Sequence, residues 1–302
     1  MKQNIIEIDN LNVGYSRQDM VLTDLNLNIK PSSIFGFLGR NGAGKSTLLK
    51  TIMGLVKLKT GSIRLFNLPI EQHRREIFSR IGTLIDSPSI YNHLTGIENL
   101  EIYGRYYNLK KNRIDEVVDI VGLGDYAKKK GKTYSMGMRQ RLGLALAILN
   151  DPEFLILDEP TNGLDPKGRV DFLNTVRQLN SDGKTILISS HLLSEIEKIA
   201  THIGILENKR FVFQGTMDEL HSFNRNAQLV TFKVSNPKLG SELLKSTHSI
   251  SQEHNTNQLN IQIKNENEIS EIIKVMTANE IDIYAVIPNQ KNLEGLFFES
   301  ID

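Results

Sequence analysis

A glycine-rich loop, Gly39-Arg40-Asn41-Gly42-Ala43-Gly44-Lys45-Ser46-Thr47, links an apolar run, Ile34–Leu38, to a helix-like run, Thr47–Met53. A strand that ends in such a turn and opens a helix points successive backbone N–H groups at one spot. That spot also lies at the positive end of the helix dipole. Lys45 adds a mobile positive charge, and the Ser46 hydroxyl can bind Mg²⁺. The loop therefore predicts a strand–loop–helix unit that binds the phosphates of a nucleoside triphosphate.

Length and composition limit the remaining possibilities. The 302 residues can form one large α/β domain and a smaller one. The 36 basic residues nearly balance the 35 acidic ones, which gives no reason to expect nucleic acid as a partner. The absence of cysteine excludes disulfides and suits a reducing cytosol. No signal peptide is expected in Met1–Asn10, and Leu142–Leu149 is too short an apolar run to span a membrane. Any membrane role would therefore come through a partner.

Strand-like and helix-like segments alternate from about Ile5 to about Leu220, which indicates an α/β class with a mostly parallel sheet. Helical spacing replaces this alternation between Ile90 and Lys132, so a helical subdomain is expected at about residues 90–150. The expected strands are Ile5–Ile8, Leu25–Ile29, Ile34–Leu38, Ser62–Leu65, Phe154–Leu157, Thr185–Ser189 and Ile203–Leu206.

The composition changes after about Phe223, where Asn, Gln, Ser and Lys become frequent. Alternating apolar residues still recur in this part, and they predict a small α+β module with βαββαβ order. We therefore expect a first domain at residues 1–222 and an accessory domain at 223–302. The expected accessory elements are the strands Leu229–Val234, Leu259–Ile263 and Ile281–Ile287 and the helices Ile269–Met276 and Leu293–Phe298.

Two carboxylates, Asp158 and Glu159, follow the apolar strand Phe154–Leu157. At the carboxyl end of a core strand, Asp158 would hold Mg²⁺ through its water shell, and Glu159 would polarise a water that attacks the γ-phosphate. A pair of acids at a strand end is common as a simple turn. The upstream loop and the following Pro160 favour the metal and base assignment.

Three further segments make the pattern more specific. Tyr134–Arg141 stands directly before the apolar run Leu142–Leu149, Asn162–Asp165 follows the two carboxylates, and His191 follows Thr185–Ser190. Together with the phosphate loop they resemble the ATP-binding subunits of ABC transporters, which are P-loop NTPases. The resemblance extends from about Ile5 to about Leu220, with every motif in order.

The resemblance implies roles for residues at the matching positions. Tyr15 would stack on adenine, although a half-buried strand aromatic remains the alternative. The segment Gly39–Thr47 would hold the phosphates. Ser135 and Gly137 would contact the γ-phosphate bound to the opposite protomer, Asp165 would belong to the loop at that interface, and His191 would sense the same phosphate. The implied assembly is a homodimer that encloses two ATP molecules.

Two departures from the family pattern are informative. The usual signature L-S-G-G-Q is altered at Tyr134, Met136 and Met138, while Ser135 and Gly137 remain. The glutamine that usually contacts Mg²⁺ and the membrane subunit is replaced by Asp86. An acidic residue there resembles the ATPases of bacitracin-resistance and lantibiotic-immunity exporters, which usually carry Glu. Asp86 would therefore serve the metal or the coupling, or else cap a turn before Pro88.

These observations together predict the ATP-hydrolysing subunit of an exporter for a peptide antibiotic, with ATP and Mg²⁺ as cofactors. It would be cytoplasmic and peripheral on the inner face of the plasma membrane, bound to an integral-membrane permease. Another cargo, such as a lipid, glycan or drug, stays open because the permease selects it. A soluble ATPase acting on ribosomes or DNA is disfavoured by the single phosphate loop and the short chain between Lys45 and Asp158. The lysines at 128–130 and 132 are expected to form a solvated face, with a nucleotide or membrane-surface role as the alternative.

Overall fold

The computed structural model describes residues 4–14, 19–86, 88–225, 228–245, 247–252, 257–263, 265 and 267–289. The chain divides into two compact units, Met1–Gly215 and Thr216–Asp302. The boundary expected after residue 222 falls inside helix α8 (Met217–Arg225) and stays a prediction. Tyr15 and the expected helix Leu293–Phe298 lie outside the described residues.

A six-stranded sheet forms the centre of the first unit, in the order β10-β9-β3-β8-β7-β6. The neighbours β9-β3, β3-β8, β8-β7 and β7-β6 all pair in parallel, which confirms the mostly parallel sheet. Every residue of β3, β7 and β8 is buried, as expected for strands covered on both faces. The bounds are β3 Ile34–Gly39, β6 Ile81–Leu84, β7 Phe154–Asp158, β8 Thr185–Ser190, β9 His202–Glu207 and β10 Arg210–Thr216.

A second sheet, in the order β2-β1-β4-β5, is antiparallel throughout. The expected strands Ile5–Ile8, Leu25–Ile29 and Ser62–Leu65 belong to this sheet and not to the parallel one. Burial in β2 alternates along its second half, as in a sheet with one face on the core. The bounds are β1 Ile6–Gly14, β2 Met20–Ile29, β4 Thr60–Leu65 and β5 Leu68–Pro69.

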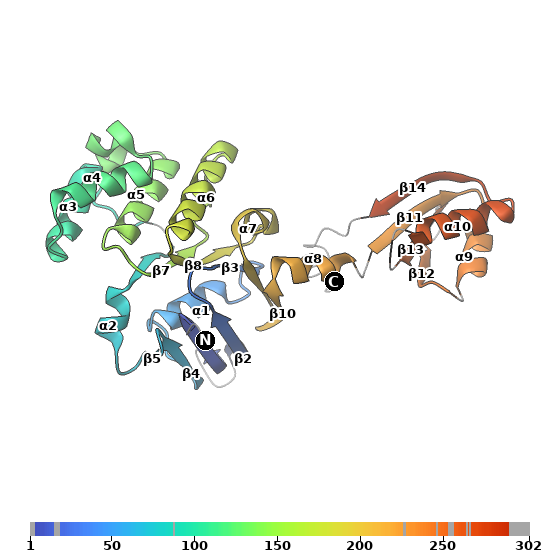
Figure 1. The fold of residues 1–302 in the computed structure, drawn as a ribbon, viewed down its shortest axis with the longest axis horizontal. Helices are drawn as coiled ribbons and strands as arrows, with labels where there is room; N and C mark the ends of the chain where they lie inside the picture. The colour runs from blue at the N-terminus through green and yellow to red at the C-terminus, as the bar shows by residue number, and fades with distance from the viewer. Residues whose placement is uncertain are drawn as a thin grey trace. The chain divides into compact units, whose positions relative to one another are not determined.

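Helix α1 (Lys45–Ile52) joins the two sheets into one core (Figure 1). Its buried residues Leu48, Leu49 and Ile52 share a cluster with apolar side chains of both sheets, including Leu27 and Phe37. This packing fixes α1 relative to β3, and the loop at residues 40–44 connects the two elements. The phosphate loop is therefore held between two well-buried elements.

A group of helices stands between β6 and β7, as expected for the helical subdomain (Figure 1, upper left). Helix α3 begins at a capping box, in which Thr95 and Glu98 each satisfy the other's backbone N–H. The members of the group are α3 Gly96–Tyr106, α4 Lys111–Ile120 and α5 Met136–Ile148, with the 3₁₀ turns η1 Gly124–Lys128 and η2 Gly131–Thr133. The remaining helices of the first unit are α2 Arg74–Ser79, α6 Pro166–Ser181 and α7 Leu193–Ile199.

The strand β6 was not expected from the sequence, since four residues with a glycine give little apolar signal. Gly82 is needed there: a Cβ at this position would overlap the carbonyl oxygen of Ala147 in α5. The helical group thus packs closely on the edge of the parallel sheet. The turn at Ile85 and Asp86 follows directly.

The second unit contains a four-stranded antiparallel sheet in the order β12-β13-β11-β14. Its own core includes Phe232, Leu259 and Met276. The order after α8 is the expected βαββαβ. The elements are β11 Gln228–Val234, α9 Pro237–Leu244, β12 Ile250–Gln252, β13 Gln258–Ile263, α10 Asn267–Ala278 and β14 Ile283–Asn289. None of the described helices in either unit is long and apolar enough to cross a membrane.

Candidate functional site

The phosphate loop has the backbone shape of an anion site. Gly42 and Gly44 have φ of 84° and 107°, a region that favours glycine. Gly44 precedes the first helical residue, Lys45, and no side chain caps the start of α1. The first turn of the helix also contains no acidic residue. Its N–H groups and the positive end of its dipole are therefore ready for a phosphate.

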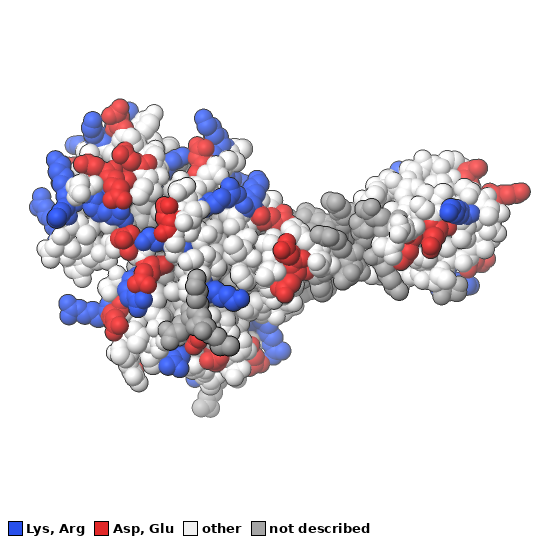
Figure 2. All heavy atoms as spheres, viewed as in Figure 1, with Lys and Arg blue, Asp and Glu red and all other residues white. Residues whose placement is uncertain are grey.

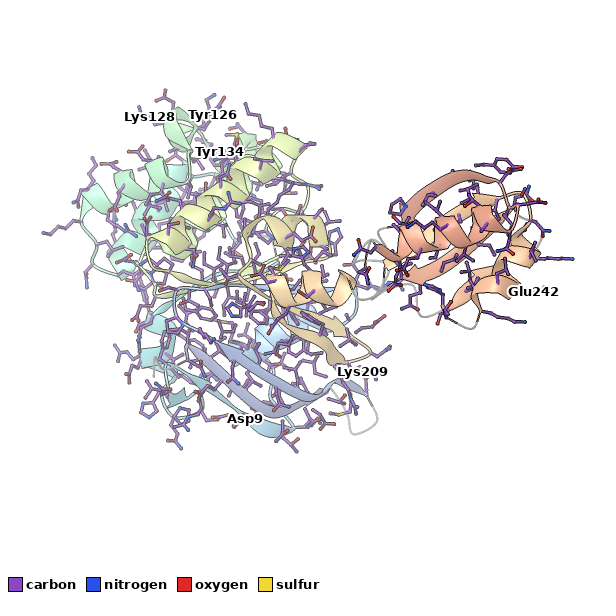
Figure 3. All side chains as sticks on the ribbon, turned by 45° about the vertical axis from the view of Figure 1, so that its right-hand side comes forward. Asp9, Tyr126, Lys128, Tyr134, Lys209 and Glu242 are labelled. Atoms are coloured by element: carbon purple, nitrogen blue, oxygen red, sulfur yellow. The ribbon has the colours of Figure 1, made fainter. Side chains whose placement is uncertain are left out.

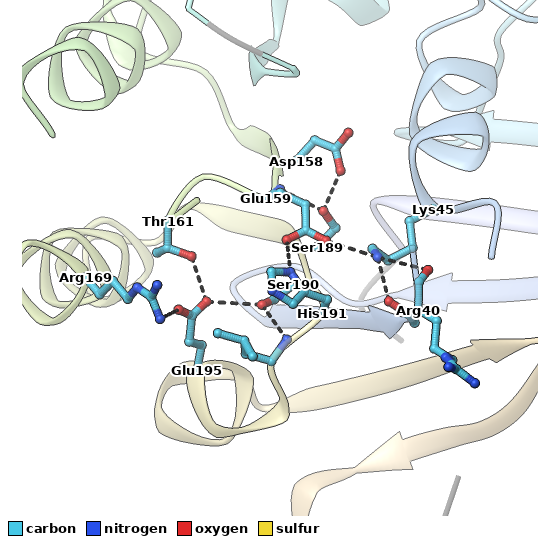
Figure 4. Close-up of polar contacts among 12 residues, drawn as sticks. Arg40, Lys45, Asp158, Glu159, Thr161, Arg169, Ser189, Ser190, His191 and Glu195 are labelled. Carbon is cyan, nitrogen blue, oxygen red and sulfur yellow. Dashed lines mark hydrogen bonds and ion pairs between the residues drawn. The ribbon is translucent and has the colours of Figure 1, made fainter. Parts of the chain in front are cut away.

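Lys45 is folded back over its own loop. Its side chain is only 6% exposed, and Nζ donates to the Gly39 carbonyl at 2.6 Å and to the Arg40 carbonyl at 3.4 Å (Figure 4). The same Nζ lies 3.0 Å from Oε1 of Glu159. Since the lysine has three N–H donors, a phosphate on the loop could replace these contacts one for one.

The parallel register of β7 and β8 places Asp158 opposite Ser189. The Ser189 hydroxyl donates to Asp158 Oδ1 at 2.5 Å and accepts from the Glu159 N–H at 2.9 Å. Asp158 is buried, with 4% of its surface exposed. Ser189 thus holds both carboxylate residues at the sheet edge, a role that sequence reasoning missed. The only sequence signal is a hydroxyl at the end of a core strand.

Glu159 lies between two groups that carry or accept a positive charge. Its Oε2 is 2.7 Å from His191 Nδ1, and its Oε1 faces Lys45 (Figure 4). Burial raises the pKa of Glu159, but the contacts with His191 and Lys45 lower it by more, so the net pKa is below its ordinary value. The carboxylate is therefore ionised at neutral pH. Its backbone φ of 46° is a strained conformation for a side chain of this kind, costing on the order of 1–3 kcal/mol.

The donor set fits Mg²⁺ with ATP. The Asp158 carboxylate and the Ser46 hydroxyl, in the first turn of α1, are the hard oxygen ligands that Mg²⁺ prefers. Within the described residues, no group of three or more His, Cys, Asp or Glu could hold a metal on protein ligands alone. A small set of protein ligands suits Mg²⁺, because water molecules and phosphate oxygens usually complete its coordination.

Asp86 comes two residues after β6, which pairs with β7 through Leu84 and Leu157. It therefore lies at the same sheet edge as Asp158. Its Oδ2 lies 3.1 Å from Lys50 Nζ in α1, and 65% of its side chain is exposed. The backbone φ of Asp86 is 60°, a left-handed conformation that Asp adopts more readily than Glu. This preference gives a physical reason for an Asp in this turn.

The altered signature begins at a tyrosine that is buried in the helical group. The Tyr134 hydroxyl donates to the Tyr126 carbonyl at 2.8 Å, and burial raises the pKa of Tyr134. Tyr126, Lys128 and Tyr134 lie together at the outer end of this group (Figure 3). Lys128 pairs with Asp125 at 3.3 Å, and Lys129 stands over the Tyr126 ring at 4.7 Å. Lys128 and Lys129 therefore have local partners.

Ser135 and Gly137 start helix α5. The Ser135 hydroxyl caps it by accepting from the Met138 N–H at 3.3 Å, and no acidic residue stands in its first turn. In the described structure no hydrogen bond joins either residue to the phosphate loop. Asp165 caps α6 in the same way, through the Gly168 N–H at 3.1 Å. These two helix starts are thus separate from the group formed by Lys45, Glu159 and His191.

Basic and acidic side chains alternate over the visible face of the first unit (Figure 2). No large area of that face carries one sign of charge. Long-range attraction therefore does not select a charged polymer on this face, and specificity rests on the site itself.

Known proteins are similar to this chain in sequence, one of them along nearly its whole length. A family described as "ABC transporter" matches residues 22–162. The bacitracin transport ATP-binding protein BcrA of Enterococcus faecalis is 36% identical over 300 residues, which cover 98% of this chain and 96% of that protein. The lantibiotic transport ATP-binding protein SrtF of Streptococcus pyogenes is 37% identical over 214 residues, covering 71% of this chain and 92% of that protein.

The fold has close counterparts as well. The structure of cbiO1 from Clostridium perfringens, part of the ABC transporter complex cbiONQ, has a TM-score of 0.68 at 26% identity. The matched region covers 73% of this chain and 91% of the cbiO1 chain. The resemblance read from the phosphate loop, Asp158-Glu159 and Asp86 is confirmed by these relatives. The chain belongs to the family of ATP-binding subunits of ABC transporters.

Proposed function

We propose that this chain hydrolyses ATP to drive export of a peptide antibiotic through a separate membrane permease. The observation that carries the proposal is the group of Lys45, Glu159 and His191 at the phosphate loop, with distances of 3.0 and 2.7 Å to the glutamate. Similarity to a bacitracin transport protein over 98% of the chain supports the cargo class. The subunit would act in the cytoplasm, on the inner face of the plasma membrane.

Each residue has a definite task in this proposal. The loop N–H groups and Lys45 hold the β- and γ-phosphates, and Tyr15 stacks on adenine. Mg²⁺ supplies charge neutralisation at the phosphate oxygens, and Ser46 and Asp158 would hold it. Glu159 accepts a proton from the attacking water, and His191 orients that carboxylate. The chemistry then depends mainly on positioning and on charge stabilisation.

A second copy of the chain completes the site in this proposal. Ser135 and Gly137 present the N-terminus of α5 to the γ-phosphate on the opposite protomer, and Asp165 borders that interface. ATP thereby holds the homodimer closed until hydrolysis. The turn at Asp86 transmits closure to the permease, and residues 223–302 form an accessory domain.

Survival against cell-wall-targeting peptides tests the proposal. The gene is expressed with its neighbouring membrane-protein genes, as wild type, as Lys45→Ala and as Lys57→Ala, an exposed lysine that serves as the matched control. We expect wild type and Lys57→Ala to protect against bacitracin or a lantibiotic, and Lys45→Ala to give no protection. Absence of protection against every peptide would exclude peptide export and leave a lipid, glycan or drug as cargo.

A further inference from the structure

A buried glutamate outside the reacting group joins the segments that carry it. Glu195 lies in the first turn of α7, and its side chain is 8% exposed. Its Oε2 accepts from the Thr161 hydroxyl at 2.6 Å and from the Ser190 hydroxyl at 3.1 Å (Figure 4). A buried carboxylate is stable only where hydrogen bonds and charges offset its lost hydration. Loss of these hydrogen bonds would leave the buried carboxylate unpaired, so they hold Glu195, Thr161 and Ser190 in one arrangement.

Each of the two hydroxyl residues is close in sequence to one of the proposed reacting residues. Thr161 follows Glu159 by two residues, and Ser190 directly precedes His191. The Ser190 hydroxyl also accepts from the Leu192 N–H at 3.0 Å, which fixes the turn around His191. One carboxylate oxygen thus links the segment that follows β7 to Ser190, the last residue of β8. This contact limits how far Glu159 and His191 can move apart.

The other oxygen of Glu195 extends the network to α6. Its Oε1 lies 3.6 Å from Nη1 of Arg169, and it is buried without a hydrogen bond among the described residues. Arg169 Nε in turn donates to the Leu164 carbonyl at 3.2 Å. Leu164 belongs to the Asn162–Asp165 loop. Glu195 therefore connects two segments. It contacts the turn that carries His191 directly, through Ser190, and it contacts the Asn162–Asp165 loop through Arg169.

We propose that Glu195 is a positioning residue, which sets the distance between Glu159 and His191 and links that pair to the Asn162–Asp165 loop. The inference rests on the proposed ATPase function. Glu195 does not touch the nucleotide in this proposal. It acts on turnover by keeping the water-activating carboxylate in register, so that ATP binding is affected far less than hydrolysis.

The test measures kcat and KM for ATP with Mg²⁺ in the purified full-length chain. The variants are Glu195→Ala, Glu195→Gln and Thr161→Val, with Glu197→Ala on the exposed side of α7 as the matched control. Thr161→Val keeps the packing volume and removes one hydrogen bond to Glu195. We expect Glu195→Ala to lower kcat at least about tenfold, with KM within about threefold of wild type.

Two comparisons separate positioning from simple stabilisation. Glu195→Gln keeps an oxygen acceptor and should recover part of kcat. The double variant Thr161→Val/Glu195→Ala should lose no more kcat than Glu195→Ala alone, because both changes remove the same contact. Glu197→Ala should match wild type. Wild-type kcat in both Glu195→Ala and Thr161→Val, or losses that multiply in the double variant, would overturn the inference.

Lys45→Ala is measured beside these variants to test the proposed function separately. Turnover that survives in Lys45→Ala would contradict the ATPase site itself. Turnover that disappears in Lys45→Ala but stays unchanged in the Glu195 variants would contradict only the positioning role.

Discussion

Lys45 Nζ lies 3.0 Å from Glu159 Oε1, so the lysine of the phosphate loop is paired with the carboxylate proposed as the general base. Both groups are largely buried, with 6% and 17% of their side chains exposed. A γ-phosphate on the loop would compete with Glu159 for the same ammonium donors. ATP binding is therefore expected to release Glu159 from Lys45 and leave it paired with His191. The base would thus lose its pair with Lys45 when its substrate binds.

Glu159→Gln is expected to separate ATP binding from hydrolysis. The amide removes the competitor for Lys45, so ATP should bind at least as tightly as to wild type. Without a general base, kcat should fall by about 10²- to 10⁴-fold. Size-exclusion chromatography with ATP and Mg²⁺ should show a trapped dimer, and Glu197→Gln serves as the control. Normal turnover in Glu159→Gln would remove the base assignment.

The stability of the fold should depend on pH through Glu159. Burial raises its pKa, but the contacts with His191 and Lys45 lower it by more, so the net pKa is below the ordinary value of 4.5. A folded pKa below the unfolded one stabilises the native state above the unfolded pKa, and this stabilisation is lost as the pH falls through the folded pKa. The thermal midpoint of wild type relative to Glu159→Gln should therefore be highest near neutral pH and should decline below about pH 4.5. A difference that stays constant on acidification would contradict the pairing.

Asp86→Asn tests the acidic turn without disturbing its backbone. Asn tolerates the left-handed conformation at φ 60°, and loss of the exposed pair with Lys50 should change stability by less than about 1 kcal/mol. If the carboxylate serves the metal, the Mg²⁺ concentration needed for half-maximal ATPase should rise in Asp86→Asn. If Asp86 only caps the turn, the Mg²⁺ titration and transport should match wild type. Lys50→Ala is the control, because it breaks the ion pair and keeps the acid.

Gly82→Ala should weaken the contact between the helical group and the parallel sheet. The added Cβ meets the backbone carbonyl of Ala147, which cannot move aside as a flexible side chain would. We expect a loss of about 1–3 kcal/mol in the free energy of unfolding. Gly104→Ala, inside α3, is the matched control: a Cβ there makes ordinary contact with Ile114 of α4, and stability should stay equal or rise by up to about 1 kcal/mol. Equal denaturation midpoints for the two variants would show that α5 can yield at Ala147.

Much of the site could be predicted from the sequence because its parts are local. The strand, glycine loop and helix at Gly39–Thr47 are continuous in the chain, and so are β7 and its two carboxylates. Each part places its own functional groups by short-range geometry. The helical group and the βαββαβ order were predicted for the same reason, since apolar periodicity reports on single elements. The role of Asp86 in metal binding and that of Tyr15 with adenine stay predictions.

Other features depend on contacts between segments far apart in the chain. The strands β1, β2 and β4 belong to a separate antiparallel sheet. The local sequence pattern does not specify with which other strand each of them pairs. Ser189 bridges Asp158 and Glu159 because β7 and β8 align in parallel register. Glu195 meets Thr161, Ser190 and Arg169 because α7 packs beside β8 and α6. The sequence alone determined which chemical groups this protein carries and on which elements. Only the tertiary structure decided which of them are neighbours, because neighbours across a sheet edge are set by strand register and helix packing.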